Sequence, residues 1–179
     1  MRLALAAALL LAGCSAYRNV TTAPVAGPDG TAVVAIAQGG NDQLGFVDAD
    51  DRLVIITAEL DRQGTIDALL PSPDGTTLLI CSRGEGHPYL SLYDLGTLVR
   101  QHDAVAVPAL RTLDPYPGGC DDPVWLDDHT LRFTSTIDFS RFDAQARRGA
   151  DTTADADAPV RTWAWDWRND TFRALPATR

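Results

Sequence analysis

Residues 72–97, SPDGTTLLICSRGEGHPYLSLYDLGT, decide the fold class. Proline fixes the backbone at a turn corner, aspartate hydrogen-bonds to a nearby amide and glycine accepts a positive φ, so Pro73-Asp74-Gly75 predicts a tight turn. The branched apolar run at residues 78–82 predicts a strand buried on both faces. A glycine-rich turn then leads into the alternating strand at residues 89–94. The stretch therefore predicts an antiparallel hairpin that begins at a tight turn.

The same plan occurs earlier in the chain. Residues 27–48 contain a Gly-Pro-Asp-Gly turn, a short apolar run, a glycine-rich turn and a second strand that ends at Asp48. Asp29 precedes Asp74 by 45 residues, and Asp48 precedes Asp94 by 46 residues. Two separate landmarks thus give one period, which indicates an internal repeat.

A third, looser copy follows. Its strands are expected at residues 124–129, 131–135 and 162–166, which leaves an insertion of about 20 residues near 138–159. The insertion is poor in large apolar side chains, so it predicts a flexible surface loop or, alternatively, a segment that binds a partner.

Each copy has the content of one propeller blade. Four short antiparallel strands in about 45 residues are typical of such arrays, and helical signals are nearly absent beyond the N-terminal segment. The fourth strand of the second copy is expected at residues 98–100 or at residues 105–107. The Asp48-Ala49-Asp50-Asp51 segment lacks the glycine and glutamate of a calcium loop and is interpreted as a turn equivalent to Asp94-Leu95-Gly96-Thr97.

The turn at residues 72–75, the strand at 78–82 and the corner at 93–97 resemble the TolB-type, WD-repeat-like β-propeller repeat, over residues 24–175. The resemblance implies an all-β fold, a partial β-propeller-like array of about three four-stranded antiparallel sheets. Propellers of this family close with more blades than this chain offers, and unpaired strand edges are unfavourable. A partial propeller, an assembly of copies and a β-sandwich remain as alternatives, the last as the alternative fold.

The N-terminus carries an export signal. Arg2 precedes an uncharged apolar run at residues 3–12, which as a helix reaches about 15 Å, half of the roughly 30 Å of a bilayer core. Leu11-Ala12-Gly13-Cys14 resembles the lipobox of bacterial lipoproteins. A plain secreted protein is the alternative.

The lipobox resemblance implies cleavage before Cys14 and a diacylglycerol on its thiol. Ser15, following the cysteine, points in that family to the periplasmic face of the outer membrane. The organisation expected is therefore a signal peptide at 1–13, a lipid-anchored tether at 14–23 and a propeller-like domain at 24–179.

The two other cysteines, Cys81 and Cys120, would lie in a compartment that oxidises thiols. A disulfide between them would close a loop of roughly 40 residues and add about 3–4 kcal/mol. Two unpaired thiols are the alternative, with Cys81 a small core residue.

Acidic residues gather late in the chain. The densest acidic cluster contains Asp121, Asp122, Asp127, Asp128 and His129. Together with His87 or His102, it could in principle hold a metal ion. The favoured interpretation is that these aspartates cap hairpin turns, so no metal site is predicted.

Three tryptophans fall at alternate positions of one expected strand: Trp163, Trp165 and Trp167. Alternation places their indoles on one face. That face is either the core between sheets or an exposed platform that binds sugar rings or a partner.

Charge excludes one class of partner. The 15 basic residues are all arginines, and the formal net charge of −9 makes nucleic acid an unfavourable partner. No nucleophile elbow or phosphate-binding glycine loop occurs, which disfavours an enzyme.

The sequence thus favours a lipid-anchored cell-envelope protein that acts as a non-catalytic binding or interaction module, without a cofactor. Its partners would be the membrane, through the lipid, and an envelope protein or a second copy of the chain. The alternative is an envelope glycan-binding or hydrolytic protein that uses the tryptophan platform and the aspartate cluster.

Overall fold

The computed structural model describes residues 25–26, 31–38, 41–48, 50–60, 64–84, 87–113, 121–141 and 158–176. The predicted signal peptide and tether, Cys14, Cys120 and most of the predicted insertion lie outside the described residues. No helix in the part of the chain that is described is long and apolar enough to cross a membrane.

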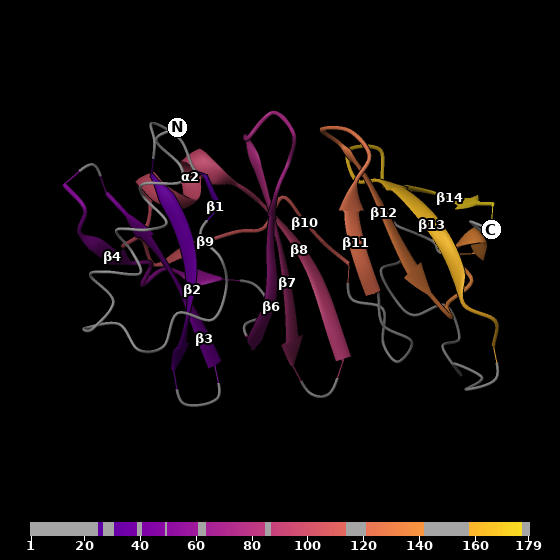
Figure 1. The fold of residues 1–179 in the computed structure, drawn as a ribbon, viewed down its shortest axis with the longest axis horizontal. Coiled ribbons are helices and arrows are strands. Elements are labelled where there is room, and N and C mark those ends of the chain that lie inside the picture. The colour runs from indigo at the N-terminus through magenta and orange to yellow at the C-terminus, as the bar shows by residue number, and fades with distance from the viewer. Residues whose placement is uncertain are drawn as a thin grey trace.

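Three four-stranded antiparallel sheets stand in a row (Figure 1). The first contains β1 (Val25–Ala26), β2 (Ala32–Gln38), β3 (Asn41–Val47) and β4 (Leu53–Ile55). The second contains β6 (Thr65–Pro71), β7 (Thr77–Gly84), β8 (His87–Asp94) and β10 (Arg111–Leu113). The third contains β11 (Asp121–Trp125), β12 (Thr130–Ser135), β13 (Arg161–Asp166) and β14 (Thr171–Leu175). The predicted all-β fold class is therefore confirmed. The three sheets form the predicted propeller-like array and not the alternative β-sandwich.

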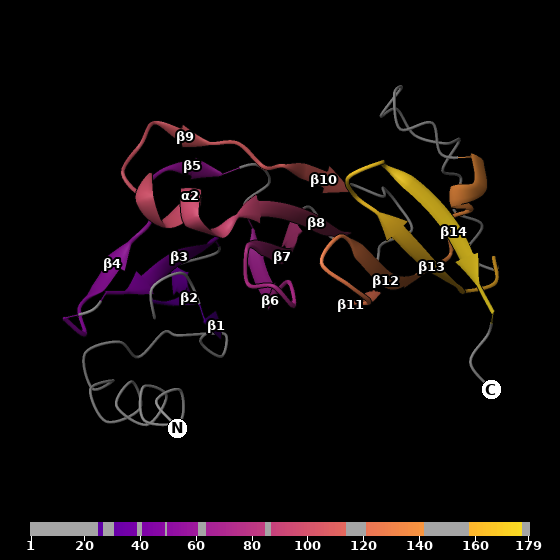
Figure 2. The same cartoon turned by 90° about the horizontal axis from the view of Figure 1, so that it is seen from above.

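The first strands of the three sheets, β1, β6 and β11, lie along one edge of the array (Figure 2). Along the other edge, beside the first two sheets, are α2 (Leu95–Arg100) and a parallel pair of short strands, β5 (Glu59–Leu60) and β9 (Ala106–Val107). A 3₁₀ turn, Phe139–Arg141, follows β12.

The fourth strand of the second sheet differs from both predictions. Residues 98–100 belong to α2, because the Asp94 carboxylate caps the helix by accepting the Thr97 N–H at 2.6 Å and because Leu95 and Leu98 are buried. Residues 106–107 pair with β5, outside the sheet. The fourth strand is β10, which pairs with β8.

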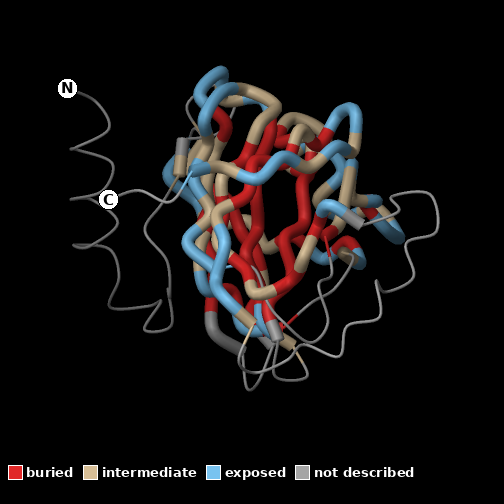
Figure 3. The backbone as a smooth tube through the Cα atoms, turned by 90° about the vertical axis from the view of Figure 1, so that its right-hand side faces the viewer, coloured by how far each residue is buried: buried red, intermediate tan, exposed pale blue. Residues whose placement is uncertain are grey.

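The second sheet is covered on both faces. Leu78 and Ile80 of β7 point into a first core shared with the first sheet, and Leu79 and Cys81 point into a second core shared with the third sheet. Seen along the row of sheets, buried segments fill the centre and exposed segments lie mainly around the periphery (Figure 3). The predicted strand buried on both faces is confirmed.

Two of the predicted turns, at residues 72–75 and 48–51, are present in the part of the chain that the structure describes. In the second sheet the Gly75 N–H donates to the Ser72 carbonyl at 2.8 Å, and Gly75 has a φ of +71°, which glycine adopts without strain. In the first sheet the Asp48 carboxylate accepts the N–H groups of Asp50 and Arg52 at 2.9 and 3.0 Å. The Asp48 segment is therefore a turn, as predicted, but it is not equivalent to residues 94–97, which form the N-cap and first turn of α2.

The outer faces of the two end sheets differ. On the first sheet Val34 and Ile36 point away from the first core, and Ile36 packs over Gly45. On the third sheet β12 buries alternate residues and turns Thr130, Arg132 and Thr134 outward. The outer face of the first sheet is therefore apolar and buried, with Val34 0% and Ile36 8% exposed, whereas the outer face of the third sheet is polar and partly exposed.

Leu79→Ala is expected to lower the free energy of unfolding by about 2–5 kcal/mol, because it leaves a cavity in the second core. Urea unfolding followed by tryptophan fluorescence measures the change. Val105→Ala is the control, since Val105 is 92% exposed and its truncation should alter stability little. Equal effects of the two substitutions would contradict the two-core arrangement.

Candidate functional site

A cavity of about 290 Å³ lies between the first and second sheets. Segments from both sheets and from the connection that carries β5 form its walls. Apolar side chains make up much of the lining: Leu44, Ile56, Ala58, Leu60, Ile66 and Ile80. A concave, largely apolar site with a few polar groups is the usual form of a small-molecule site.

Asp42, at the start of β3, is the buried charged group of this cavity. Asp42 is only 8% exposed, and its Oδ2 accepts the Ile66 N–H at 2.8 Å. The Asp42 N–H donates to the Gly64 carbonyl at 3.0 Å. Asp42 therefore ties the first sheet to the entry of the second, and among the described residues no cationic side chain contacts its carboxylate.

Hydroxyl groups complete the polar lining. Ser82, Ser91 and Tyr93 are buried. The Ser91 hydroxyl lies 3.4 Å from the Thr112 hydroxyl, and the Thr57 hydroxyl donates to the His102 carbonyl at 3.3 Å. Glu59 is exposed and lines the cavity as its second carboxylate. No arginine, lysine or histidine is among the described lining residues.

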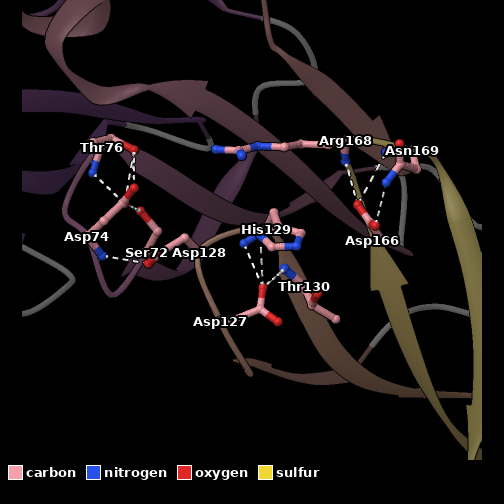
Figure 4. A network of polar contacts seen from close by, with 10 residues as sticks. All are labelled: Ser72, Asp74, Thr76, Asp127, Asp128, His129, Thr130, Asp166, Arg168 and Asn169. Atoms are coloured by element: carbon pink, nitrogen blue, oxygen red, sulfur yellow. Dashed lines mark hydrogen bonds and ion pairs between the residues drawn. The ribbon is translucent and has the colours of Figure 1, made fainter.

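A second polar region joins the turns of the second and third sheets (Figure 4). The Asp74 carboxylate accepts the Ser72 hydroxyl at 2.6 Å and the Thr76 N–H at 3.0 Å. The Asp74 N–H in turn donates to Oδ1 of Asp128 at 2.9 Å. The hydrogen bond from the Ser72 hydroxyl, followed by that from the Thr76 backbone, holds the pKa of Asp74 below its usual value.

The neighbouring aspartates of the third sheet also close turns. Oδ1 of Asp127 accepts the N–H groups of His129 and Thr130 at 2.9 and 2.8 Å, and the His129 bond is the main cause of the lowered pKa of Asp127. Burial raises the pKa of Asp166, but hydrogen bonds from Asn169 and Arg168 outweigh it and the net shift is downward. The turn-capping interpretation is therefore confirmed for Asp127.

The rest of the predicted acidic group is not brought together. Asp121 and Asp122 lie at the start of β11, and Asp127 follows the end of that strand. His102 packs edge-on against Phe46 in the first core, with ring centroids 5.4 Å apart, and the side chain of His87 lies outside the described residues. Within the described ranges, no three His, Cys, Asp or Glu side chains are placed to hold a metal ion.

The tryptophans share one face, as predicted, but that face is core. Trp163 and Trp165 are 1% exposed and Trp167 is 8% exposed. Phe139 packs edge-on against Trp163 with ring centroids 5.5 Å apart, and Phe172 stacks on Trp165 at 5.9 Å. The exposed-platform interpretation is therefore wrong, because aromatic side chains from two other segments cover the indoles.

Cys81 is a buried free thiol in the structure, and Cys120 lies outside the described residues. The disulfide between them stays a prediction. Burial, with a smaller contribution from the Asp67 charge, raises the pKa of the Cys81 thiol to about 12.

Sequence reasoning missed the cavity and Asp42. One signal was available: Asp42, Leu44 and Phe46 alternate along one strand and therefore share a face. A carboxylate at a core-facing position is unusual and marks a candidate site. Nothing in the sequence indicates that Ser91 and Tyr93, more than 45 residues away, face the same space.

Comparisons with known proteins bear on the fold. No protein-family model and no curated protein matches the sequence. TolB from Acinetobacter baumannii is similar in structure, with a TM-score of 0.53 and 17% identity, over 90% of this chain and 34% of that one. Kuenenia stuttgartiensis hydrazine synthase gives a TM-score of 0.54 and 15% identity, over 85% of this chain and 41% of that one.

The β-propeller domain of the Trilobed protease from Pyrococcus furiosus gives a TM-score of 0.52 and 14% identity, over 88% of this chain and 43% of that one. Identities this low show the fold alone. The three sheets are thus arranged like β-propeller blades, and the chain spans less than half of each of these proteins.

Asp74→Asn is expected to destabilise the protein by less than about 1 kcal/mol at pH 7, since the turn is exposed and screened by solvent. The folded pKa of Asp74 lies below its usual value of 3.8, so the charge stabilises the fold above that pH and its contribution is lost as the pH falls further. Urea midpoints measured between pH 6 and pH 3 should therefore converge with those of the unchanged protein on acidification. Asp103→Asn, at an exposed position, is the control, and a difference that widens in acid would contradict the assignment.

Cys81 is expected to resist iodoacetamide at pH 8 in the folded protein and to react in urea, because the thiolate is scarce when the thiol pKa is about 12. Peptide mass mapping reads the modification at Cys81 itself. Protection that persists in urea but disappears with a reductant would show the disulfide instead of the free thiol.

Proposed function

We propose that this chain is a lipid-anchored cell-envelope protein that acts as a non-catalytic binding module for a protein partner. The lipobox-like residues 11–14 support the anchor, and Ser15 supports the periplasmic face of the outer membrane. The propeller-like array supports the binding role, because blades and their loops offer rigid surfaces for docking.

One observation carries the binding role: the turns of neighbouring sheets are locked into one surface. The hydrogen bond from the Asp74 N–H to Asp128 joins the second sheet to the third, and Asp166 fixes the next turn by accepting the N–H groups of Arg168 and Asn169. We call the turns at residues 72–77, 126–130 and 166–170 the turn surface. A preordered surface loses little conformational entropy when it binds a partner.

The chemistry of the turn surface supports a non-catalytic role. Asp74, Asp127 and Asp166 each accept hydrogen bonds from their own turn, and their pKa values are lowered. Carboxylates held ionised in this way are poor proton donors near neutral pH, where a general acid needs a raised pKa. The burial of Trp163, Trp165 and Trp167 removes the basis of the glycan-binding alternative.

The test places a photocrosslinking amino acid at position 168 of the full-length protein in its native envelope. Arg168 is exposed on the turn surface, so we expect a discrete protein adduct on irradiation. The matched control is position 173, because Arg173 is also exposed but lies on β14. The absence of an adduct at 168, or an equal adduct at 173, would overturn the binding role of the turn surface.

The anchor is tested in the same cells. Cys14→Ser is expected to abolish incorporation of labelled palmitate and to move the protein from the membrane fraction to the soluble fraction. Dual or triple acylation holds a protein on a membrane far more firmly than one chain, so the shift should be nearly complete. Retention of the label in the serine variant would overturn the anchor without bearing on the turn surface.

A further inference from the structure

We propose that the cavity between the first and second sheets binds a small protonated amine that carries an apolar group and no carboxylate. The cavity lies beside β5 and the entry of β6, between sheets that the turn surface does not join. The inference is therefore independent of the proposed function.

The buried charge of Asp42 points to a cationic ligand. Buried carboxylates in proteins are normally paired with a cation or fully hydrogen-bonded, because desolvation of a charge is costly. In the described part of the chain the Asp42 carboxylate has one side-chain hydrogen bond, from the Ile66 N–H to Oδ2, and no ion pair. Among the described residues no donor contacts Oδ1, and an ammonium group at the wall of the cavity would supply both a donor and a positive charge.

The remaining polar groups agree with this charge. Glu59, the second carboxylate of the lining, adds to the negative potential. The hydroxyls of Ser82 and Ser91 are neutral, and the described lining holds no arginine, lysine or histidine. A ligand carboxylate would therefore be repelled by Asp42 and Glu59 and would find no cation among the described lining residues, which favours a simple amine over a free amino acid.

The apolar wall determines the rest of the ligand. Leu44, Ile56, Ile66 and Ile80 surround the space next to Asp42, so an apolar group attached to the amine would be removed from water there. The volume of about 290 Å³ is at the small end of ligand pockets, which restricts the site to a small molecule.

The site is held in place before any ligand arrives. A Cβ at position 64 would lie 2.3 Å from the Arg83 carbonyl oxygen, so only glycine allows the chain to pass this close to β7. Near this approach the Gly64 carbonyl accepts the Asp42 N–H, and the Ile66 N–H donates to the Asp42 carboxylate. The Ile66 N–H thus orients the Asp42 carboxylate, and the Gly64 carbonyl holds the Asp42 backbone.

The experiment is calorimetric titration of the full-length protein in detergent with 2-phenylethylamine, 2-phenylethanol and phenylalanine. We expect the amine to bind and the other two to bind at least tenfold more weakly, because the alcohol lacks the charge and phenylalanine adds a carboxylate. Equal binding of the alcohol would overturn the proposal and leave a merely apolar cavity.

Two variants, titrated in the same detergent, control for partitioning of the amine into micelles, because that partitioning is the same for every variant. Asp42→Asn keeps an oxygen acceptor for the Ile66 N–H and should weaken amine binding at least tenfold. Glu59→Gln, at an exposed position whose substitution leaves the core intact, should weaken it about two- to threefold, since solvent screens the exposed charge. Unchanged amine affinity in both variants, each with the unfolding midpoint of the unchanged protein, would overturn the proposal.

Discussion

The structure depends on a central sheet that must be covered on both faces. Leu78 and Ile80 lie on one face of β7, and Leu79 and Cys81 lie on the other. Each face would expose apolar side chains to water unless another sheet packed against it. The first and third sheets supply these covers. The way these two sheets pack on the second sheet determines where the cavity lies and which turns are in contact. The cavity and the turn surface therefore both follow from the need to cover the central sheet.

The third sheet ends the array in a polar face. Strand β12 buries Leu131, Phe133 and Ser135 and turns Thr130, Arg132 and Thr134 outward. Burying the Arg132 guanidinium without a countercharge would be costly, whereas in solvent it caps the array, as the polar outer repeats of solenoid proteins do.

Local chemistry in the sequence predicted most strands and turns, because Pro-Asp-Gly corners and branched apolar runs act within a few residues. It failed at residues 98–100, where the capping of α2 by Asp94 and the burial of Leu95 and Leu98 outweigh strand propensity. Alternation predicted the shared face of Trp163, Trp165 and Trp167, but their burial depends on Phe139 and Phe172 from separate segments. Asp42 was detectable only as a polar residue in a core-facing position, and its cavity depends on contacts between sheets that no local pattern encodes.

The cavity and the packing of the first two sheets are one system. Protein interiors are normally close-packed, so a cavity at this interface forgoes packing contacts that a filled interface would make. Asp42 lines this space and also joins the sheets through Gly64 and Ile66, so a cation that pairs with it acts on the interface itself. Any ligand that binds only the assembled pair of sheets stabilises that assembly by mass action. Ligand binding in the cavity and docking of the first sheet on the second are therefore thermodynamically linked. The affinity of the ligand can be measured through the stability of the docked sheets.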